Sequence, residues 1–319
     1  MPNSGRPKPK PSQQALLRAS LRLFKECFRL KKAQRVAIVV DGKSRIAYAL
    51  ETAALMLGAK IAGKITLSPL RAHSSPIPSA AKIFAAADIV AAPTTKSISH
   101  SPQTREARKN GTRFATMPSI TEELFVKAMN ADFGIIRKNC GRLKRILDNA
   151  SVVRVASANG TDIALDVSER KFEADDGVLW KRGRLCNVPF GEVCTAPTNA
   201  NGIIVPNSMR HSAKMGGTIF VENGRIVRAT GGATGFLRHL DRFGKCGRVV
   251  GELGIGTNPA FKKSMGLILQ DEKIAGSAHV AFGASCCYRT NKCGVHEDVV
   301  VENVRLWADG KEIKHQTAL

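Results

Sequence analysis

The sequence predicts an α/β protein with an N-terminal, doubly wound and mostly parallel sheet, followed by a strand-rich α+β domain. Up to about residue 150, apolar strand-like runs alternate with helical patterns, which is typical of a parallel sheet. Beyond that point, Asn-Gly and Asp-Gly pairs separate alternating runs, which is typical of antiparallel hairpins. A chain of 319 residues also fits two domains better than one. We therefore expect a flexible basic tail over residues 1–12, an N-terminal domain over 13–150 and a C-terminal domain over 151–319.

The elements of the first half follow from local pattern. Residues 13–30 place leucine and phenylalanine at helical spacing, and RVAIVVDG at 35–42 is nearly all β-branched, as in a strand buried on both faces. The segment after this strand reads DGKSRI and lacks the glycine pattern of a dinucleotide-binding turn, so we expect no nucleotide there. The alternation then continues with helix 44–58, strand 60–69, a helix and the strand Asp88–Ala92, a helix ended by Asn110-Gly111, a strand to Met117, and a helix capped by Thr121.

Three two-residue turns organise the second half. Asn159-Gly160, Asn223-Gly224 and Asp309-Gly310 each separate two apolar or alternating runs. These residue pairs tolerate the positive φ angles that tight hairpins require. We therefore expect antiparallel hairpins at all three places.

Charge and composition limit the classes of partner. The net charge is +23, and residues 1–45 carry twelve Lys and Arg side chains against two acids. Such a patch attracts nucleic acid, but aromatic residues make up only 5% of the chain and no nucleic-acid-binding motif is present, so we expect no such partner. No apolar run approaches the ~20 residues of a membrane helix, and the N-terminus lacks the apolar core of a secretory signal. We expect a cytoplasmic protein, without a membrane partner, whose eight cysteines are reduced thiols.

A histidine and two acids precede three valines in VHEDVVV. On a strand, His296 and Asp298 share one face, while Glu297 faces the other way. Imidazole and carboxylate groups are common ligands of Zn²⁺, Mn²⁺, Co²⁺ and Fe²⁺. The spacing indicates a metal site, although charged residues at a strand end that faces water would give the same pattern.

Three further candidates lie in the same domain. His279 stands in the apolar run SAHVAFGAS, where a histidine buried in a core is the alternative. Glu252 follows a strand in GRVVGELG, and Glu192 follows a turn in VPFGEVC. A carboxylate among apolar residues is costly unless it is paired or binds a metal. The five residues together therefore favour a metal-binding domain.

Six stretches of this chain, taken in order, resemble the aminopeptidase T (leucyl aminopeptidase) family of metallopeptidases. The resemblance implies a dinuclear metal site in the C-terminal domain, held by the five residues above, with peptide or a small molecule as substrate and a homodimer as the assembly. Family members place a tyrosine soon after the first histidine, and Tyr288 is the candidate here; with Glu192 it completes the expected catalytic pair. The stretches are SISHSPQTREARKNGTRFATMPSIT, NGTDIALDV, PFGEVCTAP, VGELGIGTNP, DEKIAGSAHVAFG and VHEDVVV.

The mechanism that this resemblance implies is hydrolysis of a peptide's first bond with two divalent ions, Zn²⁺, Co²⁺ or Mn²⁺. A wider resemblance to 2,5-dihydroxypyridine dioxygenases implies an alternative, in which His279, His296 and Asp298 hold one Fe(II). A degenerate homologue that only binds a partner is a third possibility, which the full set of ligands argues against. The cysteine-rich segment around Cys286, Cys287 and Cys293 departs from the family pattern, and it raises a further possibility, in which cysteine sulfurs join the metal.

Overall fold

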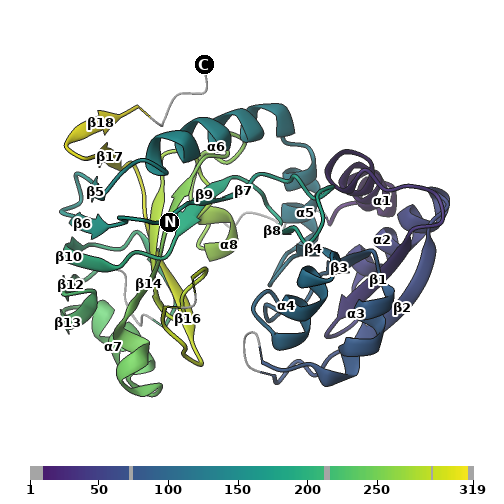
Figure 1. The fold of residues 1–319 in the computed structure, drawn as a ribbon, viewed down its shortest axis with the longest axis horizontal. Helices are drawn as coiled ribbons and strands as arrows, with labels where there is room; N and C mark the ends of the chain where they lie inside the picture. The colour runs from purple at the N-terminus through teal and green to yellow at the C-terminus, as the bar shows by residue number, and fades with distance from the viewer. Residues whose placement is uncertain (1–9, 72–74, 212–215, 289, 315–319) are drawn as a thin grey trace, which may run out of the picture. The chain divides into compact units, whose positions relative to one another are not determined.

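The computed structural model describes residues 10–71, 75–211, 216–288 and 290–314 (Figure 1). Contacts divide the chain into two compact units, Met1–Ala131 with Leu179–Pro189, and Asp132–Val178 with Phe190–Leu319. This division places the boundary at residue 131 rather than near 150, and it returns a later segment to the first unit. Residues 1–9 of the predicted basic tail lie outside the described residues.

The first unit contains a parallel sheet, as predicted. In the described part of the chain its order is β2-β1-β3-β4-β8, and every pairing is parallel. The fifth strand was not predicted, because it comes from the segment that returns from beyond residue 150. The strands are β1 (Arg35–Val40), β2 (Lys60–Thr66), β3 (Ile89–Ala92), β4 (Arg113–Thr116) and β8 (Leu185–Asn187).

Four of the helices described in this unit begin after a capping serine or threonine. Ser44 and Thr121 accept hydrogen bonds from the main-chain N–H groups of Ala47 and Leu124, so the predicted Thr121 cap is confirmed. The helix predicted over 13–30 is α-helical at first and then becomes a π-helix. The helices are α1 (Gln13–Arg22), η1 (Leu23–Phe28), α2 (Arg45–Met56), η2 (Pro78–Ala80), α3 (Ala81–Ala86), α4 (Pro102–Lys109) and α5 (Glu122–Met129).

The second unit contains two antiparallel sheets, so the predicted fold class is confirmed. Over the described residues, one sheet has the order β13-β12-β10-β6-β5-β17-β18 and the other β11-β16-β15-β14-β9-β7. The strands are β5 (Val152–Ala156), β6 (Asp162–Asp166), β7 (Glu173–Asp175), β9 (Glu192–Thr195), β10 (Asn199–Ile204), β11 (Ser208–Met209), β12 (Ile219–Glu222), β13 (Arg225–Ala229), β14 (Val250–Gly256), β15 (Ala278–Gly283), β16 (His296–Val301), β17 (Arg305–Ala308) and β18 (Lys311–Ile313).

All three predicted hairpins are present in this unit. They join β5 to β6, β12 to β13 and β17 to β18, each as an antiparallel pair. At the last two turns both central residues have positive φ, as the Asn-Gly and Asp-Gly pairs allow. The predicted two-residue turn at Asn159-Gly160 is wrong, because β5 ends at Ala156 and β6 begins only at Asp162, and of the pair only Gly160 has positive φ. The helices of the unit are α6 (Phe133–Leu147), α7 (Ala233–Asp241), η3 (Gly244–Arg248) and α8 (Ile268–Asp271). Within the described ranges, no helix is long and apolar enough to cross a membrane.

Candidate metal centre

The five side chains predicted as metal ligands lie on one face of the sheet that contains β14. They come from four adjacent strands, whose order is β16-β15-β14-β9. Because alternate residues of a strand share a face, the pairing register puts all five on the same side. These residues are Glu192 on β9, Glu252 on β14, His279 on β15, and His296 and Asp298 on β16.

Glycine leaves room for the central imidazole. Gly254 on β14 pairs with His279 on β15. A Cβ atom at position 254 would lie 2.0 Å from Cε1 and 2.3 Å from Nε2 of His279, closer than any side chain tolerates. The GELG sequence therefore makes a gap in the sheet face into which the imidazole fits.

Glu252 stands between the two histidines. Its Oε1 lies 3.6 Å from His279 Nε2, and its Oε2 lies 3.3 Å from His296 Nε2. Each histidine has a second carboxylate: Glu192 Oε2 is 3.7 Å from His279 Nε2, and Asp298 Oδ1 is 3.5 Å from His296 Nε2. The result is two histidine-containing ligand groups that share Glu252.

The charges in this cluster depend strongly on one another. Burial disfavours a charged imidazole, but the nearby Glu252 and the other surrounding carboxylates raise the pKa of His279 to about 9. Burial likewise opposes the charge on Glu252, yet the two histidines lower its pKa well below the usual range. Without metal, the imidazoles therefore take the positive charge that the carboxylates require.

A main-chain contact orients His296. Its Nδ1 donates to the carbonyl oxygen of Ala284 at 2.6 Å, which leaves Nε2 facing Glu252 and Asp298. A ligand histidine is commonly fixed by a hydrogen bond from its other ring nitrogen. The loop after β15 thus sets the direction of the second imidazole.

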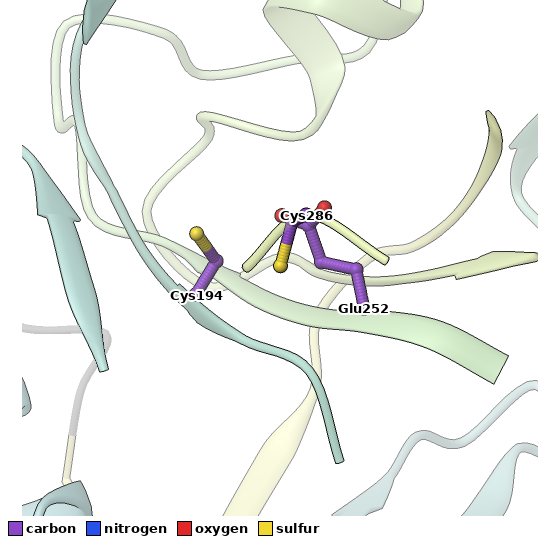
Figure 2. A group of neighbouring side chains, drawn as sticks. All are labelled: Cys194, Glu252 and Cys286. Atoms are coloured by element: carbon purple, nitrogen blue, oxygen red, sulfur yellow. The ribbon is translucent and has the colours of Figure 1, made fainter. Parts of the chain in front are cut away.

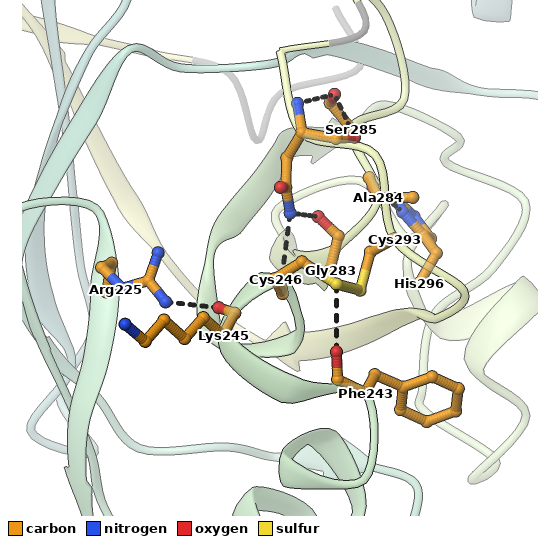
Figure 3. Close-up of a disulfide and its surroundings, with 10 residues drawn as sticks. Arg225, Phe243, Lys245, Cys246, Gly283, Ala284, Ser285, Cys293 and His296 are labelled. Atoms are coloured by element: carbon orange, nitrogen blue, oxygen red, sulfur yellow. Dashed lines mark hydrogen bonds between the residues drawn. A yellow bond between two sulfur atoms is a disulfide. The ribbon is translucent and has the colours of Figure 1, made fainter.

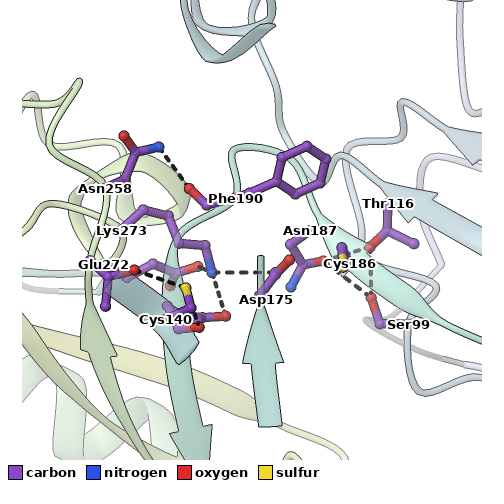
Figure 4. A network of polar contacts seen from close by, with 12 residues as sticks. Ser99, Thr116, Cys140, Asp175, Cys186, Asn187, Phe190, Asn258, Glu272 and Lys273 are labelled. Atoms are coloured by element: carbon purple, nitrogen blue, oxygen red, sulfur yellow. Dashed lines mark hydrogen bonds and ion pairs between the residues drawn. The ribbon is translucent and has the colours of Figure 1, made fainter. Parts of the chain in front are cut away.

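A buried lysine, which sequence reasoning missed, lies beside the cluster. The side chain of Lys273 is fully buried, and its Nζ is 2.5 Å from Glu192 Oε1 and 3.0 Å from Glu272 Oε1. Asp175 is 3.9 Å away (Figure 4). Burial raises the pKa of Glu272 to about 7, although Lys273 opposes this shift. The lysine therefore balances part of the negative charge and fixes one oxygen of Glu192.

The residues present fit divalent metal ions. Glu192 Oε2 and His279 Nδ1 are buried side-chain atoms without a hydrogen-bond partner, an arrangement that is costly unless a cation or another group satisfies the site. Carboxylate and imidazole groups are also the donors that zinc, cobalt, manganese and iron accept. Around the shared Glu252, the donors Glu192, His279, His296 and Asp298 would hold the ions.

Glu297 faces away from this cluster, as the strand period predicts. Its Oε1 lies 3.3 Å from His211 Nε2 and 3.7 Å from His239 Nε2. The two imidazole rings stack with centroids 3.6 Å apart and planes within 11°. Since one ion cannot lie in the planes of two parallel stacked rings, this second cluster does not have the geometry of a metal site.

The prediction that all cysteines are reduced thiols is wrong. Cys246 and Cys293 form a disulfide with a Cα–Cα distance of 5.6 Å, although they are 47 positions apart in sequence (Figure 3). The fold brings η3 and the loop before β16 together, which pattern alone does not reveal. The sulfur of Cys293 is therefore committed to Cys246 and is not a metal ligand.

Tyr288 has a partner outside the cluster. Its hydroxyl accepts a hydrogen bond from the main-chain N–H of Lys171 at 2.5 Å and lies 3.1 Å from the carbonyl oxygen of the same residue. The side chain is 45% exposed and stacks against the Arg170 guanidinium. A catalytic role for Tyr288 stays a prediction that these contacts do not favour.

Comparison with known proteins places this chain in an enzyme family. A family model described as NicX, 2,5-dihydroxypyridine 5,6-dioxygenase, matches residues 15–319. The chain belongs to this family. It is the family of the wider resemblance, rather than the aminopeptidase T family named first. Membership supports an enzyme, and the clustered donors support metal binding.

Two solved structures share the fold over nearly the whole chain. The 2,5-dihydroxypyridine dioxygenase from Pseudomonas putida KT2440 has a TM-score of 0.82 at 20% identity, covering 95% of this chain and 96% of that chain. Wild-type AmpT from Thermus thermophilus has a TM-score of 0.67 at 17% identity, covering 94% and 97%. Identities this low show the fold alone. Among curated proteins, the comparison found no relative.

Proposed function

We propose that the protein is a metal-dependent aminopeptidase-like hydrolase, with two divalent cations held on either side of Glu252. One observation carries this proposal: the two oxygens of Glu252 face different histidines, at 3.6 Å and 3.3 Å. A carboxylate that faces two donor groups in this way is suited to bridge two ions. Among the described residues, no group of potential ligands contains both His279 and His296.

The charge of the cluster supports two ions. Imidazoles that bind a metal are neutral, so the five carboxylates are then opposed by one ammonium group only. Even with Glu272 protonated, this is more negative charge than a single divalent ion offsets. Buried carboxylates without compensating charge are costly. The carboxylates are Asp175, Glu192, Glu252, Glu272 and Asp298.

The chain's own residues would divide the work of hydrolysis. When bound, the divalent cations would acidify a water and polarise a peptide carbonyl. Glu192 is the candidate proton acceptor, because Lys273 holds its Oε1 and leaves Oε2 facing the cluster. Glu252 fixes the two ligand groups relative to each other, and the gap at Gly254 keeps the His279 ring in register.

A dioxygenase is the second candidate. It is favoured by the family match and by the dioxygenase structure from Pseudomonas putida KT2440. In that case His279, His296 and Asp298 would hold one Fe(II) with open positions for oxygen. The two imidazole nitrogens, now directed at opposite oxygens of Glu252, would have to converge on one ion.

The two candidates are separated by assaying one protein preparation in two ways. The metal-stripped chain is loaded with Zn²⁺, Co²⁺, Mn²⁺ or Fe(II), then tested for release of an N-terminal residue from peptides and for oxygen uptake with hydroxylated pyridines. The proposal expects peptide hydrolysis with about two equivalents of metal. Oxygen uptake that saturates at one equivalent of iron, without hydrolysis, would replace it with the dioxygenase.

A further inference from the structure

Two cysteine thiols lie on the metal-binding face and have no role in the site described so far. Cys194 on β9 pairs with Gly254, while Glu192 pairs with Gly256, so the thiol and the Glu192 carboxylate share one face. Cys286 lies in the loop after β15. Figure 2 shows that the two thiols and Glu252 come from three different segments that meet at this point.

The donor atoms of these residues are close enough for one ion. The sulfurs of Cys194 and Cys286 and a carboxylate oxygen of Glu252 all lie within 4.8 Å of one another. Neither sulfur is in a disulfide, and both residues are partly buried. Glu252 is thus common to three ligand groups: one with Glu192, one with Asp298 and one with the two thiols.

We propose that Cys194 and Cys286, together with Glu252, form a thiolate–carboxylate site for a thiophilic divalent cation such as Zn²⁺ or Co²⁺. Thiolates are soft ligands that favour zinc and cobalt over magnesium and manganese. On binding, each thiol gives its proton to solvent and the sulfur donates a lone pair to the cation. The pair would therefore bias the Glu252 centre towards thiophilic metals.

The neighbouring Cys287 serves as a control, because its thiol lies near the proposed site but is not one of the proposed ligands. Its sulfur lies 3.3 Å from the Cys286 sulfur, but it accepts a hydrogen bond from the main-chain N–H of Ala196 at 3.2 Å. It belongs to none of the potential ligand groups among the described residues. Cys287→Ser is therefore a matched control, one residue away in sequence and different in geometry.

Cobalt absorption tests the site directly. Metal-free full-length protein, with Cys194 and Cys286 shown by mass spectrometry to be free, is titrated with Co²⁺ and followed in the near ultraviolet. Thiolate-bound Co²⁺ gives a sulfur-to-metal charge-transfer band that carboxylate and imidazole ligands do not give. The band is expected in the natural chain and in Cys287→Ser, reduced in Cys194→Ser and in Cys286→Ser, and absent from the double variant.

The Zn²⁺ affinity of the double variant gives the size of the expected effect. Loss of an outer partner of a metal ligand typically lowers affinity 10–100-fold, so removing two direct ligands should lower the Zn²⁺ affinity of this site by about 100-fold or more. Binding of Co²⁺ to the natural chain without the band would overturn the proposal. So would a band that persists in the double variant, or a Cys194–Cys286 disulfide in the metal-loaded protein.

The outcome does not depend on the reaction that the centre catalyses. The band is measured without substrate, so a chain that shows it but hydrolyses no peptide keeps the thiolate site and loses the hydrolase. A chain that hydrolyses peptides but does not show the band keeps the hydrolase and loses the thiolate site. Thermal unfolding of each serine variant checks that the fold is retained. If a variant does not fold, the presence or absence of the band in the natural chain still tests the proposed thiolate site.

Discussion

Replacing Gly254 with alanine should displace the His279 imidazole and weaken metal binding. The new Cβ would lie 2.0 Å from His279 Cε1, whereas ordinary contact begins at 3.4 Å. The ring must therefore move by about 1.4 Å, since a carbon–carbon contact of 2.0 Å is not sterically possible. Distances to a metal tolerate only about 0.2 Å. We expect loss of metal binding at the His279 side of the cluster.

The same overlap has a cost in stability. Overpacking a filled site typically costs about 1–3 kcal/mol, and Gly254 has no positive φ that would add backbone strain. A double-mutant cycle with His279→Ala isolates the clash, because removing the ring removes the atoms that the new methyl group meets. Chemical denaturation gives the free energy of unfolding, and calorimetric titration with Zn²⁺ gives the affinity.

A matched glycine provides the control. Gly141 lies within α6, where an added Cβ meets nothing within 4 Å, so Gly141→Ala should leave metal affinity unchanged and stabilise the helix by up to about 1 kcal/mol. The reasoning is refuted if Gly254→Ala binds Zn²⁺ as the natural chain does. It is also refuted if the effects of Gly254→Ala and His279→Ala on stability simply add.

Further outcomes follow from the same contacts. Asp298→Asn should lower bound metal per chain by elemental analysis, whereas Glu297→Gln, on the opposite face of the strand, should not; equal loss in both would contradict the strand geometry. Lys273→Met leaves Glu192 and Glu272 without their ammonium partner, so the metal-free protein should lose about 3–5 kcal/mol of stability in denaturant titrations, and an unchanged midpoint would count against the buried ion pairs. Chelation should lower the melting temperature, since a cation present at 100 times its Kd stabilises by about 2.7 kcal/mol; a melting temperature insensitive to chelator would mean that no metal is bound. Replacing both disulfide cysteines with serine should cost about 4 kcal/mol in the chain-entropy model for a 47-residue loop, and non-reducing peptide mapping that finds both thiols free would remove the premise.

Much of the fold follows from local pattern. The helix–strand alternation of the first unit and the three hairpins of the second depend on interactions between near neighbours, and the structure has them where the sequence places them. Helix α6 was not predicted, because basic side chains interrupt its apolar pattern, although its buried residues recur at helical spacing. Strand β8 was missed because its partner β4 is about 70 residues earlier, and three residues carry no period of their own.

The meeting of the five candidate residues on one sheet face was predictable for a different reason. Strand alternation puts His296 and Asp298 on the same face within three residues. Carboxylates within apolar stretches also stand out in the sequence, because burying them is costly unless they are paired or bind a metal. Lys273 was not predictable, because lysine is nearly always exposed and nothing in its local sequence indicates burial. The Cys246–Cys293 disulfide depends on a contact across 47 residues, which spacing alone does not specify.

The central claim is that two ions share Glu252, and anomalous X-ray diffraction from crystals of the metal-loaded chain tests it most directly. Two peaks about 3.5–4 Å apart are expected, one beside His279 and the other beside His296, with the Glu252 carboxylate between them. A single peak within bonding distance of both histidines would contradict it.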